Sequence, residues 1–136
     1  AGITIDIEER HQDIYAVVDT PLMQQVLLNL VHNAVEVSPS GSKVTIEVGR
    51  DSEGRPEITV SDHGCGMTEE VMAEIFEPFF TTKAVGEGTG LGLSIAEGIV
   101  RQHDGEIQVD SRPGKGTRMR VLLPASNLDL SGKLTD

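Results

Sequence analysis

The stretch of residues 76–93, FEPFFTTKAVGEGTGLGL, constrains this chain more than any other. After a polar Thr-Thr-Lys step it places glycine at every second position, at Gly86, Gly88, Gly90 and Gly92. Glycine reaches positive φ at little steric cost and lets backbone N–H groups approach a ligand closely. A helical pattern follows at once, so the loop leads into a helix N-terminus, where unpaired N–H groups and the helix dipole attract anions. We interpret the stretch as a flexible lid over a polyphosphate.

The charge of the chain limits its partners. Its 136 residues are expected to form one domain, and 11 basic against 22 acidic residues give a net charge of −11. A surface for nucleic acid or for an anionic membrane needs a basic footprint. We therefore expect neither nucleic-acid binding nor direct membrane contact, and we interpret the acidic excess as a contribution to solubility.

The cysteine content and the N-terminus indicate the compartment. The single cysteine, Cys65, excludes an internal disulfide and fits a reducing compartment, and we expect it to be a small packed residue rather than a nucleophile. No run of about 18 apolar residues occurs, and the first ten residues lack the regions of a signal peptide. We expect a cytoplasmic protein. Because the chain begins on a predicted strand without an initiator Met, we also expect it to be a fragment of a longer one.

Hydrophobic patterns and turn residues predict the order of the secondary structure. Strands are predicted over residues 3–7, 14–18, 43–49, 57–61, 106–109 and 117–123, and helices over 21–37, 68–76 and from 91 to about 103. This order implies an α/β fold. We expect a two-layer α/β sandwich, with a mixed, mostly antiparallel sheet of about five strands and three helices on one face.

The predicted helix over 21–37 carries a polar stripe of unusual composition. At 100° per residue, five of its polar side chains fall within one arc of about 100°, and the rest of the circumference is apolar except for Gln24. The stripe consists of Gln25, Asn29, His32, Asn33 and Glu36. Solvated stripes are commonly rich in Glu, Lys and Arg, which form i,i+4 pairs. A stripe centred on two asparagines presents neutral oxygens, so we favour a cavity-facing role over an ordinary surface face.

Two common nucleotide-binding motifs are absent. A Walker loop needs Gly-Lys followed by Ser or Thr, whereas Gly114-Lys115 is followed by Gly116. A Rossmann fingerprint needs GxGxxG between a strand and a helix, whereas the glycines here run GxGxGxG and follow a predicted helix. Neither common fold for nucleotides therefore fits.

The remaining motifs occur in a fixed order: NLVHNA, DHGCGM, FEPFFTTK, GEGTGLGL and GKGT. Together they resemble the N, G1, F, G2 and G3 boxes of the ATP-binding catalytic domain of bacterial sensor histidine kinases. That domain has the Bergerat fold, shared with type II topoisomerases, Hsp90 and MutL. The resemblance spans residues 3–124, and its short lid points to the nitrogen-regulation and FixL-like branch. It implies a catalytic domain over residues 1–124 and a loose tail over 125–136.

The resemblance implies how the adenine end is bound. Asp62 would accept a hydrogen bond from the adenine amino group, and guanine, which lacks that group, would face an unpaired carboxylate. Gly64 and Gly66 would let the backbone lie against the base. Met67 and Thr117 would complete this end of the nucleotide site.

The resemblance also implies how the phosphates and a metal ion are bound. Asn33 would give a side-chain oxygen to Mg²⁺ with Asn29 beside it, and Mg²⁺ takes few protein ligands together with substrate phosphates. Lys83 is a candidate for the γ-phosphate, with a solvated lysine as the alternative. The backbone of the lid and of the following helix would hold the phosphates through Gly88, Gly90, Leu91, Gly92 and Leu93. The phenylalanines of residues 76–80 are expected to serve hinge and core packing.

Two positions depart from common forms of the family. Glu36 stands where many members carry a lysine that touches phosphate, which puts that contact in doubt here. His63 replaces a usual asparagine, and we expect little effect. None of the four histidines is followed by an acidic residue and then Asn-Pro, the family's phosphoacceptor pattern. The accepting histidine is therefore expected on a separate helical dimerisation domain, N-terminal to residue 1.

The resemblance implies a protein-histidine kinase domain. It would bind ATP with Mg²⁺, pass the γ-phosphate to that histidine and release ADP, with a response regulator downstream. Phosphoryl transfer depends chiefly on positioning and charge neutralisation, so no general base is assigned. Two alternatives stay open: a serine kinase of the anti-sigma type and a non-catalytic adenine-nucleotide-sensing module. The isolated chain is expected to be a monomer with little turnover, and its parent a dimer.

Overall fold

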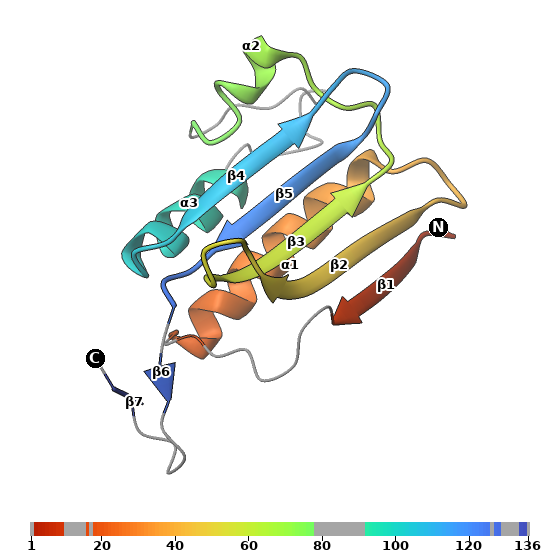
Figure 1. The fold of residues 1–136 in the computed structure, drawn as a ribbon. Coiled ribbons are helices and arrows are strands. Elements are labelled where there is room, and N and C mark those ends of the chain that lie inside the picture. Colours follow the sequence, from red (N-terminus) through yellow and green to blue (C-terminus); the bar gives the residue numbers. More distant parts are fainter. Residues whose placement is uncertain are drawn as a thin grey trace.

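The computed structural model describes residues 2–9, 16, 18–77, 92–125, 127–128 and 134–135 (Figure 1). The elements are β1 (Thr4–Glu9), α1 (Thr20–Val37), β2 (Lys43–Arg50), β3 (Pro56–Asp62), α2 (Glu69–Met72), α3 (Gly92–Gln102), β4 (Glu106–Ser111), β5 (Thr117–Leu122), β6 (Asn127–Leu128) and β7 (Leu134–Thr135). The last two form a short antiparallel pair of their own. Whether residues 125–136 form a loose tail stays a prediction.

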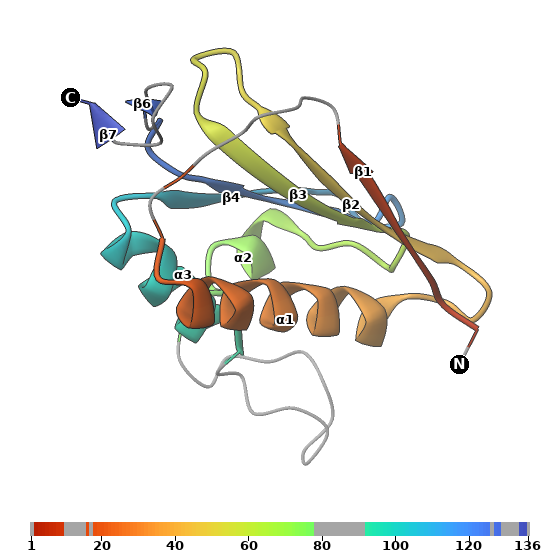
Figure 2. The same cartoon turned by 90° about the horizontal axis from the view of Figure 1, so that it is seen from below.

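The main sheet has five strands in the order β1-β2-β3-β5-β4. Strand β1 pairs parallel with β2, and the other neighbours pair antiparallel. Figure 2 shows the helices on one side of this sheet, with α1 running beneath its middle strands. The predicted two-layer α/β sandwich with a mixed, mostly antiparallel sheet is confirmed. Among the described helices, none is long and apolar enough to cross a membrane.

Two predicted elements need correction. The strand expected over residues 14–18 is wrong where the structure describes it, because Ala16 and Val18 lie outside any strand. Both residues pack against the core, so their apolar character reflects tertiary packing without strand pairing. The helix expected over 68–76 is shorter, because only Glu69–Met72 is helical. The turns that follow lead to Ile75, which is buried in the core.

Helix α1 begins and ends through local capping. The Asp19 carboxylate accepts a hydrogen bond from the N–H of Leu22 at 3.1 Å, an N-cap of the usual kind. At the other end, the hydroxyl of Ser38 donates to the carbonyl of Ala34 at 2.6 Å. The buried positions recur every three or four residues, as expected for a helix with one core-facing side. They are Met23, Val26, Leu30 and Ala34.

The core lies between the sheet and the two long helices. Apart from the buried residues of α1, it includes side chains of all three inner strands and of α3. These are Val44, Val60, Met119, Val121, Ala96, Ile99 and Val100. Phe76 packs against this cluster, as predicted, while Phe79 and Phe80 lie outside the described residues. Cys65 is exposed, so its expected packing is wrong.

The two long helices are joined at their ends by His103. Its Nε2 accepts a hydrogen bond from the N–H of Asp19 at 2.9 Å, and its Nδ1 lies 2.8 Å from the carbonyl oxygen of Ile99. Because a carbonyl can only accept, Nδ1 carries the proton, and because Nε2 accepts, the ring is neutral. The end of α3 is therefore fixed to the start of α1.

At one end of the sheet, two chain segments approach each other backbone to backbone. The turn between β4 and β5 has Gly116 at φ +77°, and a Cβ there would collide with the carbonyl oxygen of Asp62. The loop after β3 has Gly66 at φ +73°, where a Cβ would collide with the carbonyl oxygen of Arg112. The N–H of Gly114 also donates to the carbonyl of Cys65 at 2.6 Å. Both close approaches require glycine.

Replacement of a core leucine of α1 should cost far more stability than replacement of its exposed neighbour. Leu30 is 1% exposed, so Leu30→Ala should lower the free energy of unfolding by about 2–5 kcal/mol. Leu28 is 65% exposed, and Leu28→Ala should change it by less than about 0.5 kcal/mol. Urea unfolding of both variants measures the difference. Equal losses would contradict the orientation of α1.

The backbone approach at Gly116 can be separated from simple backbone strain. Gly114 also has positive φ, +77°, but nothing lies within 4 Å of its Cβ position. Gly114→Ala should therefore cost only the left-handed conformation, about 1–2 kcal/mol. Gly116→Ala adds a collision with Asp62, so it should cost about 1–3 kcal/mol more in urea unfolding. A similar loss in both variants would mean that the turn moves away freely.

Candidate functional site

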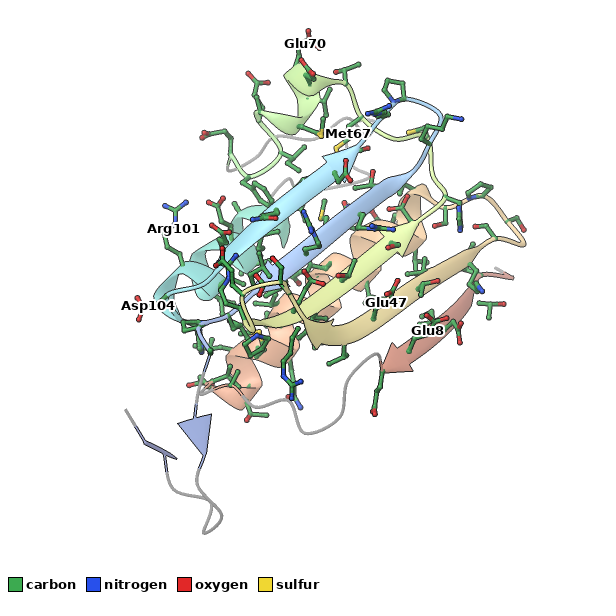
Figure 3. The ribbon with its side chains drawn as sticks, in the orientation of Figure 1. Glu8, Glu47, Met67, Glu70, Arg101 and Asp104 are labelled. Atoms are coloured by element: carbon green, nitrogen blue, oxygen red, sulfur yellow. The ribbon has the colours of Figure 1, made fainter. Side chains whose placement is uncertain are left out.

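The predicted site residues fall into two groups. The loop after β3 and the start of β5 bring together Asp62, Gly64, Gly66, Met67 and Thr117. In Figure 3, Met67 lies at the end of the sheet where β4 finishes, next to the short helix α2. The second group joins α1 to the start of α3. Four predicted residues, Lys83, Gly88, Gly90 and Leu91, lie outside the described residues.

Asp62 is a buried carboxylate with a fixed orientation. It is 7% exposed at the end of β3, and its Oδ1 accepts a hydrogen bond from the N–H of Gly64 at 2.8 Å. Burial raises the pKa of the carboxyl, while the N–H groups of Gly64 and Thr117 and the nearby His63 favour the ionised form, and the net pKa lies above the usual 3.8. The site thus holds a hydrogen-bond acceptor whose ionisation depends on its surroundings.

The glycines of this loop serve contacts within the protein. A Cβ on Gly64 would lie 2.6 Å from the carbonyl oxygen of Val37, at the C-terminal end of α1. Gly66 is required by the approach to Arg112 described above. The loop is therefore confined between α1 and the β4–β5 turn. Contact of its backbone with a bound base stays a prediction.

Ser111 holds this loop and the neighbouring turn together. Its Oγ accepts a hydrogen bond from the N–H of Met67 at 2.9 Å and donates to the carbonyl of Gly116 at 2.8 Å. It also lies 2.9 Å from Oγ1 of Thr117. Ser111 is 8% exposed, so these contacts are shielded from water. The sequence reasoning missed Ser111, because a serine at a predicted strand end gives no signal of contacts made 44 residues away.

The two asparagines of α1 differ in their surroundings. Nδ2 of Asn29 donates to the carbonyl of Gly92 at 2.9 Å, and Oδ1 accepts from Nε2 of Gln25 at 2.7 Å. Asn29 thus fixes the first residue of α3 to α1. The half-buried side chain of Asn33 makes no hydrogen bond to any described residue, so its amide oxygen is available to a ligand.

Glu36, which stands where many family members carry a lysine, has a partner on its own helix. Nε2 of His32 lies 3.2 Å from a carboxylate oxygen of Glu36, one helical turn further along α1. The side chain of His32 is 75% exposed, so this pair is worth little in stability. Within the described ranges, no group of three or more His, Cys, Asp or Glu side chains is arranged to hold a metal ion. A neutral amide such as that of Asn33 fits Mg²⁺ when phosphates supply the negative oxygens.

The start of α3 presents backbone N–H groups that have no partner within the helix. The first N–H groups of a helix have no partner within it, and they favour anions. Gly92 and Leu93 occupy this turn, and no atom lies within 4 Å of the Cβ position of Gly92. The side chain of Leu93 packs against the core, which anchors the turn.

Comparison with known proteins identifies related domains. The family model described as histidine kinase-, DNA gyrase B- and HSP90-like ATPase matches residues 18–127. The histidine-protein kinase AtoS of Escherichia coli strain K12 is 42% identical over 106 residues, which are 78% of this chain and 17% of AtoS. The chain spans about a fifth of the length of the curated relatives it matches.

Solved structures agree with the family match. The nucleotide-free catalytic domain of histidine kinase ThkA is 34% identical with a TM-score of 0.78, and the likeness covers 91% of this chain and 80% of that one. Full-length ShkA in complex with AMPPNP is 29% identical with a TM-score of 0.80, covering 91% of this chain and 26% of ShkA. Since the family model covers most of the chain and the folds agree, the chain belongs to the histidine kinase-, DNA gyrase B- and HSP90-like ATPases, as a catalytic domain of the sensor histidine kinase type.

Proposed function

We propose that this domain binds Mg·ATP and donates the γ-phosphate to a histidine on a separate helical dimerisation domain. The observation that carries the proposal is the buried carboxylate of Asp62, held by the N–H of Gly64. An ionised carboxylate can only accept hydrogen bonds. It matches the amino group of adenine, which donates. The carbonyl oxygen of guanine also only accepts, so it and the carboxylate would face each other without a hydrogen bond.

The phosphate end is assigned to α1, the lid and the start of α3. Asn33 would bind Mg²⁺ through its amide oxygen, and Asn29, whose oxygen accepts a hydrogen bond from Gln25, would act mainly by holding α3 in place. Bound Mg²⁺ would neutralise phosphate charge, which matters in a chain of net charge −11. The N–H groups of residues 92–93 would contact phosphate, with the sequence-based candidates Lys83, Gly88, Gly90 and Leu91 completing the site.

The phosphate acceptor and the downstream partners are assigned outside this chain. His103 is engaged with Asp19 and Ile99, so it is not free to serve as an acceptor, and His32 lacks the family's phosphoacceptor sequence pattern. The relatives are sensor kinases several times longer than this chain, which supports a separate dimerisation domain and a response regulator. The same names favour a histidine kinase over a serine kinase of the anti-sigma type. We retain the nitrogen-regulation and FixL-like branch and a cytoplasmic location as parts of the proposal.

Calorimetric titration with ADP and with GDP, each with and without Mg²⁺, tests the adenine site. ADP should bind saturably and GDP at least about a hundredfold more weakly, because its base leaves Asp62 unpaired. Asp62→Asn should weaken ADP binding by roughly tenfold to a hundredfold, since hydrogen bonds to charged groups are worth about 1.5–3 kcal/mol. Ser61→Ala is the matched control, because its Oγ is buried without a partner among the described residues. Equal affinity for ADP and GDP would exclude the proposed function.

The raised pKa of Asp62 predicts how stability depends on pH. The folded state holds the Asp62 proton more tightly than the unfolded state, so unfolding releases a proton between the usual pKa of 3.8 and the raised value. The free energy of unfolding should therefore fall as pH rises through this window and then level off. Asp62→Asn has no titrating proton at this position, so wild type should lose stability relative to the variant as pH rises in urea unfolding from about pH 3.5 to 7. A constant or opposite difference would contradict the pKa shift.

A further inference from the structure

We propose that Ser111 is a positioning residue that sets base selectivity, because it fixes the hydroxyl of Thr117 as an acceptor toward the nucleotide. The inference rests on the proposed function, since it concerns the same adenine end. It assigns a role to a buried side chain that lies outside all five sequence boxes. Two neighbouring hydroxyl groups, with one proton each, determine this role.

Ser111 has one proton and three polar neighbours. The carbonyl oxygen of Gly116, at 2.8 Å, can only accept, so the hydroxyl proton of Ser111 is directed there. The N–H of Met67 donates to Ser111 Oγ at 2.9 Å. The remaining contact, at 2.9 Å from Thr117 Oγ1, must therefore be donated by Thr117. Both lone pairs and the proton of Ser111 are then used.

This arrangement determines what Thr117 can offer a ligand. A hydroxyl has one proton and two lone pairs, and the hydroxyl of Thr117 donates its hydrogen bond to Ser111. Only acceptor capacity remains. Thr117 pairs directly with Asp62 across β5 and β3, so the two side chains lie on the same face of the sheet. An ionised Asp62 also only accepts, so these two side chains together present acceptors alone.

An all-acceptor pair selects between purine bases. The amino group of adenine, or a water molecule that donates at this point, satisfies it. The carbonyl oxygen of guanine cannot, and leaves buried acceptors unpaired. If Ser111 is removed, the Thr117 hydroxyl can rotate and donate, and the site then tolerates an acceptor on the base. Selectivity for adenine should fall even though Asp62 and Thr117 are both present.

Ser111 also holds the two flanking segments in a fixed position relative to each other. Its contacts with Met67 and Gly116 join the loop after β3 to the β4–β5 turn on either side of Asp62. A purely structural role would therefore weaken all ligands alike. A role through Thr117 predicts a loss specific to adenine that disappears when Thr117 has no hydroxyl. The two roles are separable.

A double-mutant cycle on the full 136-residue chain makes this separation. Binding of ADP and GDP is measured by calorimetry for wild type, Ser111→Ala, Thr117→Val and the double variant. Ser111→Ala should weaken ADP roughly threefold to tenfold, the value of one neutral hydrogen bond, and leave GDP unchanged or tighter. The double variant should bind ADP about as Thr117→Val does, because Ser111 acts through a hydroxyl that is no longer there.

Two control variants and a folding measurement show whether a loss of binding comes from misfolding. Ser61→Ala removes a hydroxyl of the neighbouring strand that has no hydrogen-bond partner among the described residues, and it should bind like wild type. Ser111→Thr keeps the hydroxyl and should restore most of the selectivity. Circular dichroism at the titration temperature establishes that each variant is folded, and a Ser111→Ala chain that is unfolded there would assign Ser111 a purely structural role, against the proposal.

The outcomes separate this inference from the proposed function. Wild type that binds ADP selectively, with Ser111→Ala unchanged, would overturn the role of Ser111 and leave the function standing. Additive losses in the cycle, or equal loss of ADP and GDP affinity, would also overturn it, since Ser111 would then act independently of Thr117. Wild type that binds neither nucleotide would overturn the proposed function and this inference together.

Discussion

The close packing of two backbone segments at the end of the sheet is the constraint on which the rest of the site depends. Gly66 and Gly116 each occupy a position where a side chain would strike a carbonyl group of the opposite segment. This contact brings the end of β3 against the β4–β5 turn and leaves Asp62 buried between them. A carboxylate held by short, crowded backbone has few alternative orientations. In the proposed adenine site, that rigidity would allow one acidic group to distinguish two purines, because discrimination requires that an unmatched acceptor cannot move to find another partner.

Helix α1 connects this end of the site with the core. One of its faces carries Met23, Val26, Leu30 and Ala34 into the core, and the hydrophobic effect fixes its rotation. The arc beside this face then carries Asn29, which contacts the carbonyl of Gly92 in α3, and Asn33 one turn further on, whatever a ligand requires. The two asparagines look alike in the sequence, but their environments assign them different roles. Asn29 forms hydrogen bonds with Gln25 and Gly92, whereas Asn33 forms none with the residues that the structure describes.

Sequence reasoning worked where local pattern and tertiary structure agree. The apolar face of α1, the strand order after it and the start of α3 follow from periodicity and turn residues, and the structure confirms them. It failed where contacts between residues far apart in the chain determine the structure. Ala16 and Val18 read as strand residues, yet they pack against the core without a partner strand. From the sequence, Gly64 and Gly66 are attributed to the close approach of a bound base, although contacts with Val37 and Arg112 already require glycine at both positions. Ser111 was not found, and Gln25 was placed in the polar stripe without its contact to Asn29, since both act through contacts that only the folded chain creates.

The two contacts between α1 and α3 have a mechanical consequence for the whole domain. One joins Asp19 to His103 and the other joins Asn29 to Gly92, so the helices are fixed to each other at two points. These points are separated by about 15 Å along α1 and by nearly the same length along α3. Two contacts on each helix oppose sliding as well as rotation of one helix against the other. A relative movement of α1 and α3 therefore has to break at least one of these hydrogen bonds.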